Sequence, residues 1–511
     1  MIRKIIIFSD NNGTLVNFVR ITPTANNFRI NFMKTASNLR LSYMLRNVGY
    51  TVLPIHNCLS FTSDELETIF KNFSSGENVL VCVSTSFINT TYKKNTISDR
   101  KYAEFGSYWS KDAFSFFVRM MFIAKKYNFP IIMGGWEISP DKHHANSRHA
   151  WGFDLLDKFV DYYIMNNDIQ PIVDICQGKK LSYKDISGSK IVEGNEIKDY
   201  SDCSSAPLKS DIIMPGESLS TEIAAGCIFS CQFCNFGALG KKKHEFMRTY
   251  ESLERELMSN YEAYKTTVYL LTDNIMNDYD EKLKYLIRFR EKTGIDIRWS
   301  GYVRLDTIRT KEQTRLLLDS GIAGASFGIE SLKKEAGPSI GKMTDKTRLL
   351  KSLDIFRSVI GDNAITSGLF ISGLPTETPD ELMNTYEWLH SKEGIDYLDH
   401  YSFTSLVLHE NLETKTDINI SRNDPFRMYE RKNKMNWVSP WGRSETFLKL
   451  AREFNTDVKK TRSGIGSFSL PFLHNLGLEI SRSVKLIRSK DLHEIDKNVL
   501  NVIEFNQTRI N

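Results

Sequence analysis

The chain has 511 residues, of which 41% are hydrophobic and 25% are charged, and its formal net charge is +5. A chain of this length is too long for one hydrophobic core, so we expect two or three domains. The composition is that of a globular protein, which excludes the disordered and fibrous classes. Because the net charge is small and the basic residues are scattered, neither nucleic-acid binding nor membrane-surface binding is indicated.

Neither a membrane span nor a secretion signal is predicted. The apolar runs all fall short of the roughly 20 residues that a membrane helix needs. The apolar run at residues 5–8 is too short for a signal peptide and fits a first β-strand instead. Seven cysteines, an odd number in a long chain, favour a reducing compartment over a disulfide framework. We therefore expect a cytoplasmic protein.

Residues 1–180 alternate strand-like apolar runs with amphipathic helical segments. This alternation predicts an α/β domain with a parallel sheet, and its order predicts a doubly wound domain of the flavodoxin or Rossmann type. In such a domain ligands bind at the carboxyl ends of the strands. The expected strands are residues 5–8, 51–55, 79–83, 131–133 and 162–164, and the expected helices are residues 37–48, 64–70, 112–126 and 152–159.

Residues 181–214 are polar and irregular, which predicts a linker. A second strand–helix series over residues 215–410 predicts a partial (β/α)6 barrel, with its chemistry in the loops that follow the strands. Residues 411–511 are predicted to form a helical C-terminal region. The barrel strands are expected at residues 220–224, 267–271, 296–301, 323–328, 365–371 and 398–403, and its helices at residues 250–264, 280–292, 312–319, 346–359 and 379–390.

The most informative segment, residues 226–234, reads GCIFSCQFC. Thiolates are the standard ligands of iron–sulfur clusters, and Cys227, Cys231 and Cys234 are close enough in sequence for one loop to surround one cluster. Three cysteines leave one iron of a [4Fe–4S] cluster open to an exogenous ligand, as substrate chemistry requires. The sequence therefore predicts a metal site at these three cysteines.

Two other interpretations of the cysteine spacing are available. The same spacing follows one face of a helix, which would make the cysteines buried structural residues. A zinc site is the second alternative, but zinc takes four ligands, and the nearest possible fourth, His244, lies ten residues beyond Cys234. We therefore favour the iron–sulfur cluster.

The CxxxCxΦC pattern, in which Phe233 is the aromatic residue, opens the first loop of the barrel series. It resembles the signature of the radical S-adenosylmethionine (SAM) superfamily. The resemblance covers about residues 215–410 and implies that a [4Fe–4S] cluster cleaves SAM reductively to a 5′-deoxyadenosyl radical. Segments at later strand ends agree with it in order and spacing: LTDN at 271–274, YVRLD at 302–306, FGIES at 327–331 and ISGLPTET at 371–378.

The same resemblance implies which residues contact SAM. Phe233 would lie against the adenine, and Thr272 and Asp273 occupy the strand-end position that meets the methionine amino group. Glu330, followed by Ser331, would accept hydrogen bonds from the ribose hydroxyls.

Two further barrel residues complete the expected SAM site. Gly373 would allow close backbone approach near the adenine. For Arg304 two interpretations stay open: it pairs with the SAM carboxylate, or it forms a structural ion pair with Asp306.

The doubly wound domain in front of the barrel resembles the cobalamin-binding domain of the B12-dependent branch of this superfamily. The resemblance implies that Ser84, Ser86, Gly134 and Gly135 let the nucleotide tail of cobalamin pass close to the backbone. Small residues are also common at the switch point of any doubly wound domain. Asn12 stands where some relatives have an axial histidine, so a domain that has lost cobalamin stays an alternative.

These features predict a cobalamin-dependent radical SAM enzyme, with methyl transfer to an unactivated carbon as its reaction. The alternatives are a cobalamin-free radical SAM cyclase, oxidase or rearrangement enzyme, and a zinc-binding module without catalysis. The resemblance implies a small-molecule or biosynthetic-intermediate substrate and an electron donor of the flavodoxin or ferredoxin type. No motif indicates which substrate is used.

Overall fold

A computed structural model of the chain divides into two compact units. The first unit comprises Met1–Pro215 and Glu251–Lys265, and the second comprises Gly216–Tyr250 and Thr266–Asn511. The structure describes residues 1–9, 34–56, 58, 61–84, 110–135, 138, 153–165, 168–195, 199–202, 204–208, 211, 213–231, 233–234, 246–342, 345–374, 376–406, 430–433, 436–439, 442–456, 471 and 474.

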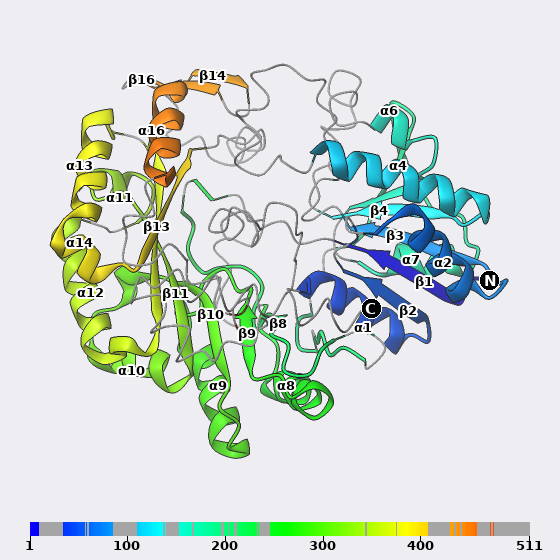
Figure 1. Cartoon of the computed structure of the whole chain (residues 1–511), viewed down its shortest axis with the longest axis horizontal. Helices are drawn as coiled ribbons and strands as arrows, with labels where there is room; N and C mark the ends of the chain where they lie inside the picture. Colours follow the sequence, from blue (N-terminus) through cyan, green and yellow to red (C-terminus); the bar gives the residue numbers. More distant parts are fainter. Residues whose placement is uncertain are drawn as a thin grey trace. The chain divides into compact units, whose positions relative to one another are not determined.

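The first unit is built on a seven-stranded sheet with the order β2-β1-β3-β4-β5-β7-β6 (Figure 1). All neighbouring pairs are parallel except β6 with β7. The order reverses direction between β1 and β3, as in doubly wound domains. The strands are β1 (Lys4–Phe8), β2 (Thr51–Ile55), β3 (Val79–Ser84), β4 (Ile131–Gly134), β5 (Tyr162–Met165), β6 (Lys184–Ile186) and β7 (Ser189–Glu193).

Helices cover both faces of this sheet, which confirms the predicted doubly wound architecture. One buried cluster joins the sheet to α2 and α4, and the other joins it to α1 and α7. Because both faces are buried, the strands are continuous apolar runs without alternation of polar residues. The helices are α1 (Ala36–Asn47), α2 (Ser63–Ser74), α4 (Ser110–Lys126), α6 (Phe153–Leu156) and α7 (Gln170–Cys176).

The segment predicted as an irregular linker, residues 181–214, contains strands β6 and β7. They form an antiparallel hairpin in which Ile186 pairs with Ser189, and β7 adds to the edge of β5. Ser187 and Gly188 both adopt positive φ, which is the backbone of a two-residue hairpin turn. The expectation of a structureless linker was wrong at these residues because this serine–glycine turn signal was overlooked.

The second unit contains a six-stranded sheet with the order β13-β12-β11-β10-β9-β8, and every neighbouring pair is parallel. Strands β8 and β13 lie at the two edges and do not pair with each other, so the barrel is open. This confirms the predicted partial barrel. Its strands are β8 (Leu219–Thr221), β9 (Val268–Leu271), β10 (Arg298–Val303), β11 (Ile322–Glu330), β12 (Ile365–Ser372) and β13 (His400–Ser405).

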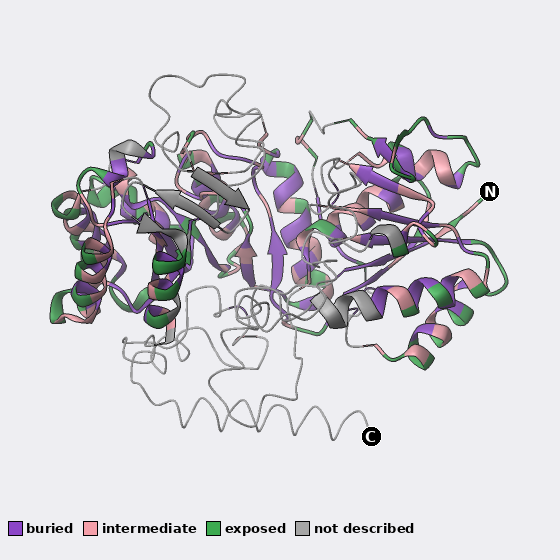
Figure 2. Cartoon of the chain, turned by 90° about the horizontal axis from the view of Figure 1, so that it is seen from above, coloured by how far each residue is buried: buried purple, intermediate pink, exposed green. Residues whose placement is uncertain are grey.

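Helices that alternate with these strands line the outer side of the sheet (Figure 1). In Figure 2 the strands are mostly buried, and the exposed residues lie on the outer faces of the helices. Helix α8 (Tyr250–Tyr264) is the exception, because it belongs to the first unit. The others are α9 (Asp280–Thr293), α10 (Lys311–Asp319), α11 (Ala336–Ser339), α12 (Lys346–Ile360), α13 (Pro379–His390) and α14 (Lys392–Tyr397).

The described part of the C-terminal region contains three short antiparallel strands, whereas the sequence predicted only helices there. They precede α16, in which the Asn455 side chain accepts the Phe403 N–H of β13 and donates to the Phe403 carbonyl. The described part of the chain has no helix that is long and apolar enough to span a membrane. The elements are β14 (Glu430–Asn433), β15 (Asn436–Ser439), β16 (Gly442–Arg443) and α16 (Ser444–Thr456).

Candidate functional site

The three predicted cluster ligands lie in the loop that follows β8, at the carboxyl edge of the partial barrel. Cys227 is buried, and Cys231 and Cys234 are half-buried. Burial raises the pKa of the Cys227 thiol to about 11, although the Phe229 N–H donates to its Sγ at 3.4 Å. This thiol is therefore protonated near neutral pH until a metal displaces the proton.

Among the residues that the structure describes, no three His, Cys, Asp or Glu side chains converge as they would around one metal ion. In a cubane cluster the three thiolates bind three different irons, so they need not converge on a single point. The donor set of this loop, three sulfurs from one short segment, fits a [4Fe–4S] cluster with one open iron.

The end of β9 supplies two of the predicted SAM contacts. Thr272 is exposed, and its hydroxyl donates to the Thr221 carbonyl at 3.2 Å. The Asp273 side chain is fully buried, and its two oxygens accept the backbone N–H groups of Ile223 and Ala224 at 2.8 and 2.9 Å. The structure thus shows Asp273 in contact with the cysteine loop, while its contact with the SAM amino group stays a prediction.

A buried ion-pair network lies behind Asp273. Lys282 of α9 is 3.3 Å from Asp273 and 2.8 Å from Asp278. Burial alone would lower the pKa of Lys282, but the two carboxylates raise it, so the ammonium stays charged. The neighbouring Asn274 accepts the Gly226 N–H at 3.1 Å, so two consecutive side chains hold the start of the cysteine loop.

The structure shows Arg304 in the ion pair with Asp306, one of the two interpretations that the sequence left open. Its Nε and Nη2 donate to the two carboxylate oxygens at 2.6 and 2.8 Å. The guanidinium stacks 3.7 Å from the centre of the Phe229 ring, and Nη1 lies 3.5 Å from the Cys231 Sγ. A fixed positive charge thus lies against one of the predicted cluster ligands.

Glu330 ends β11 with a strained backbone, because its φ of 70° lies in the left-handed region. The Lys342 Nζ donates at 2.6 Å both to the Glu330 carboxylate and to the Gly328 carbonyl. The same ammonium lies 5.8 Å from the centre of the Phe233 ring. Lys342 therefore links the predicted ribose contact to the predicted adenine contact, and no sequence motif points to it.

Ser331 and Gly373, from the ends of β11 and β12, meet through Glu377. The Glu377 carboxyl group accepts the Ser331 hydroxyl at 2.6 Å and the Gly373 N–H at 3.3 Å. It is only 1% exposed, and burial raises its pKa to about 7. Glu377 lies within the ISGLPTET segment, but no sequence signal marks it as a site residue, because the burial of an acid in a loop cannot be read from sequence.

In the first unit, Ser84 and Gly134 are paired neighbours at the carboxyl ends of β3 and β4. A side chain on Gly134 would meet the Ile164 carbonyl at 3.4 Å, so the backbone there is closely packed. Gly135 has a φ of 112°, which favours glycine. Ser86 and Asn12 lie outside the described residues.

His56 follows β2 at the same edge of the first sheet and was not predicted as a site residue. It is 8% exposed, and neither ring nitrogen has a hydrogen-bond partner within the described part of the chain. Burial lowers the pKa of His56 to about 3, with Lys34 adding to the effect, so the imidazole is neutral at pH 7.

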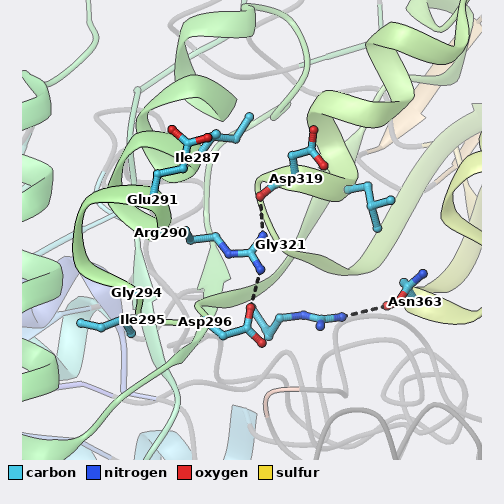
Figure 3. A pocket seen from close by; sticks show the side chains of 11 residues that line it. Ile287, Arg290, Glu291, Gly294, Ile295, Asp296, Asp319, Gly321 and Asn363 are labelled. Carbon is cyan, nitrogen blue, oxygen red and sulfur yellow. Dashed lines mark hydrogen bonds and ion pairs between the residues drawn. The ribbon is translucent and has the colours of Figure 1, made fainter.

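A hollow of about 690 Å³ lies at the opposite, amino-terminal edge of the barrel strands (Figure 3). Arg290 bridges Asp296 and the Asp319 carbonyl there, and Arg298 donates to the Asn363 carbonyl. None of the predicted site residues lines this hollow. The hollow is therefore separate from the candidate site, which lies at the carboxyl ends of the strands.

Comparison with known proteins identifies the class of this barrel. Residues 221–389 match the model of the radical SAM superfamily, and no curated protein sequence matches the chain. This segment contains the three cysteines and all the predicted SAM contacts. The match covers the barrel, about a third of the chain, and indicates a radical SAM enzyme; this superfamily uses a [4Fe–4S] cluster and SAM.

Two solved structures are similar to the chain over both units. One is the radical SAM methyltransferase TsrM from Kitasatospora setae, with cobalamin and a [4Fe–4S] cluster bound; it has a TM-score of 0.50 at 14% identity over 80% of this chain and 73% of that chain. The other is the cobalamin-dependent radical enzyme OxsB with aqua-cobalamin and SAM bound, with a TM-score of 0.54 at 15% identity over 83% of this chain and 56% of that chain. At these identities the likeness shows the fold.

Proposed function

We propose that the chain binds one [4Fe–4S] cluster through Cys227, Cys231 and Cys234 and cleaves SAM to generate a 5′-deoxyadenosyl radical that acts on a small molecule. The observation that carries this proposal is the position of the cysteine loop at the carboxyl edge of the barrel, within the segment that matches the superfamily. When bound, the cluster would supply the electron that breaks the sulfonium bond.

The residues around the loop have roles in binding and orientation under this proposal. Arg304, held by Asp306, would balance negative charge at the Cys231 thiolate. Glu330 and Phe233 would contact the ribose and the adenine, with Lys342 between them. The clamp of Ser331, Glu377 and Gly373 would hold the loop after β12 against the nucleoside.

Anaerobic reconstitution tests the ligand assignment. We expect about four irons and four sulfides per chain, and 5′-deoxyadenosine when SAM and a reductant are added. Cys231→Ala should lose the cluster and the product, whereas Cys176→Ala, which changes a buried cysteine of the first unit, should keep both. A Cys231→Ala variant with full iron content and SAM cleavage contradicts the assignment.

We also propose that the first unit binds cobalamin and that the reaction is methyl transfer to an unactivated carbon. The support is the likeness to two cobalamin-containing structures, together with the small residues Ser84 and Gly134 side by side at the carboxyl edge of the sheet. We infer that the enzyme is cytoplasmic, because thiols stay reduced in that compartment. A flavodoxin- or ferredoxin-type protein would deliver the electron there.

Cobalamin binding is measured by absorption after removal of the unbound cofactor. We expect one cobalamin per chain. Ser84→Leu should lose cobalamin, because the larger side chain blocks the strand end. Thr51→Leu, at the exposed start of β2, should keep it. Formation of both 5′-deoxyadenosine and S-adenosylhomocysteine supports methyl transfer. If cobalamin does not bind and only 5′-deoxyadenosine forms, the chain is a cobalamin-free radical SAM enzyme.

A further inference from the structure

The backbone directly before the first cysteine is held by side chains from the next strand. Residues 223–226 precede Cys227, and all four of their N–H groups have partners. The Asp273 carboxylate accepts those of Ile223 and Ala224, Asn274 accepts that of Gly226, and a backbone carbonyl accepts the fourth. Two adjacent residues at the end of β9 therefore provide three of the four acceptors.

These contacts also explain where β8 ends. The sequence predicted a strand over residues 220–224, but β8 ends at Thr221. Beyond Thr221 the N–H groups of Ile223 and Ala224 point to the Asp273 carboxylate instead of a neighbouring strand. The carboxylate thus turns the chain out of the sheet and into the cysteine loop.

The buried carboxylate of Asp273 forms an ion pair with Lys282. Lys282 is 3.3 Å from Asp273, and it is also bonded to Asp278 and to the Ile275 carbonyl, both at 2.8 Å. All three charged side chains are nearly or fully buried. A buried carboxylate without such a cation would be costly, so Lys282 allows Asp273 to present two acceptor oxygens to the loop.

We propose that Asp273, supported by Lys282, and its neighbour Asn274 are positioning residues that set the place of Cys227 relative to the other two ligands. This inference rests on the proposed cluster site. It differs from the role expected by resemblance, in which Asp273 binds the SAM amino group. Only a carboxylate offers two acceptors to two adjacent N–H groups, since an asparagine side chain offers one acceptor and a donor.

The first test needs no cluster and measures amide hydrogen exchange in the apo protein. In Asp273→Asn one of the two N–H groups, that of Ile223 or that of Ala224, loses its acceptor, and we expect its exchange to become about tenfold faster, the effect of one lost hydrogen bond. Asp280→Asn is the matched control, because it makes the same chemical change at an exposed position at the start of α9. If exchange at Ile223 and Ala224 is the same in wild type and in Asp273→Asn, the Asp273 carboxylate does not hold these two N–H groups and the inference is wrong.

The second test measures the cluster itself after anaerobic reconstitution. We expect Asp273→Asn and Asn274→Ala to lower the iron content several-fold and to alter the EPR spectrum of the reduced cluster before SAM is added. The loaded fraction should bind SAM with wild-type affinity, and the exposed control Asp280→Asn should resemble wild type in all three readouts. Asn274→Ala removes no charge, so it keeps the test valid if Asp273→Asn folds poorly.

Two results overturn the inference in distinguishable ways. If Asp273→Asn has wild-type iron content and an unchanged EPR spectrum but weak SAM binding, Asp273 is a SAM contact and the positioning role is wrong. If the wild-type chain binds no cluster, both the cluster proposal and the inference fail, whatever the amide exchange shows.

Discussion

Single buried charged residues connect the loops at the carboxyl edge of the barrel. Arg304, Lys342 and Glu377 are each buried, and each contacts groups from two different segments. Removing a charge from water is costly unless it is paired and hydrogen-bonded. These residues therefore stabilise one arrangement of the loops more than they stabilise the fold as a whole.

Arg304 allows a prediction about the electronic properties of the cluster. Its positive charge near the Cys231 Sγ should favour the reduced, more negative cluster. Arg304→Gln is expected to lower the reduction potential by tens of millivolts, a scale on which about 60 mV corresponds to 1.4 kcal/mol for one electron. Arg304→Lys keeps the charge and should shift the potential less. Potentiometric titration followed by EPR measures the reduction potential of the cluster. Equal potentials in wild type and Arg304→Gln contradict the prediction.

Glu377 allows a prediction about pH. Burial raises its pKa from 4.5 to about 7, so between these values the native state holds a proton that the unfolded chain has lost. The contribution of Glu377 to stability therefore falls as the pH rises through this window, by up to about 3 kcal/mol. Glu377→Gln stays neutral and should remove this loss, so that the variant gains stability relative to wild type from pH 4.5 to 7.

Urea unfolding at several pH values measures this difference, and Glu381→Gln is the control with the opposite sign. Burial raises the pKa of Glu381, but hydrogen bonds from Lys333 and Thr378 outweigh burial and lower it. The contribution of Glu381 to stability is therefore lost as the pH falls. A Glu377→Gln variant whose stability relative to wild type does not change with pH contradicts the assignment.

At the scale of elements, helix starts were predictable from sequence because their signals are local. Thr62 with Glu65 and Thr378 with Glu381 form capping boxes at α2 and α13, and the two residues of each pair are only three positions apart in the sequence. The β6–β7 hairpin was missed because its turn signal is only two residues long. The early end of β8 was missed because its cause, Asp273, lies about 50 residues further along the chain.

The cap of α13 provides a prediction at this scale. Thr378 accepts the Glu381 N–H, and Glu381 in turn accepts the Thr378 N–H. Thr378→Ala should destabilise the barrel unit by about 1 kcal/mol, because two N–H groups lose or loosen their partners. Ser358→Ala, at an exposed position within α12, is the matched control and should have no such effect. Urea unfolding of both variants gives the comparison.

At the scale of the whole molecule, the boundary between the units does not follow the chain. Helix α8 follows the cysteine loop in sequence but is part of the first unit. Its Glu256 is fully buried and accepts the Ser205 N–H at 2.8 Å, the Ser205 hydroxyl at 2.7 Å and the Ser204 hydroxyl at 3.3 Å. The segment around Ser205 is thus held by a helix that the sequence analysis assigned to the barrel.

Glu256→Ala should therefore loosen the first unit. Without the carboxylate, the buried Ser205 N–H loses its acceptor, so we expect its hydrogen exchange to become at least about tenfold faster. Glu262→Ala, on an exposed part of the same helix, is the control and should leave this exchange unchanged. An unaltered exchange rate at Ser205 in Glu256→Ala would show that α8 does not hold this segment.

The sequence by itself determined the two sheets, the parallel order of strands and helices, and the cysteine loop. These features depend on patterns within a few residues: apolar runs, capping boxes and the spacing of Cys227, Cys231 and Cys234. The Arg304 alternatives could be stated from sequence but not decided, because the contact of its guanidinium with Asp306 and Phe229 depends on side-chain geometry.

Only the tertiary structure decided which side chains meet at the carboxyl edge of the barrel. Asp273 and Ile223, or Ser331 and Glu377, are separated by about 50 residues of chain, and parallel strand pairing brings them within hydrogen-bond distance. Two buried carboxylates keep Lys282 charged against the effect of its burial, and burial raises the pKa of Glu377; both effects exist only once the surrounding residues have packed. The cysteine loop could therefore be located from sequence, whereas the side chains that contact it could not.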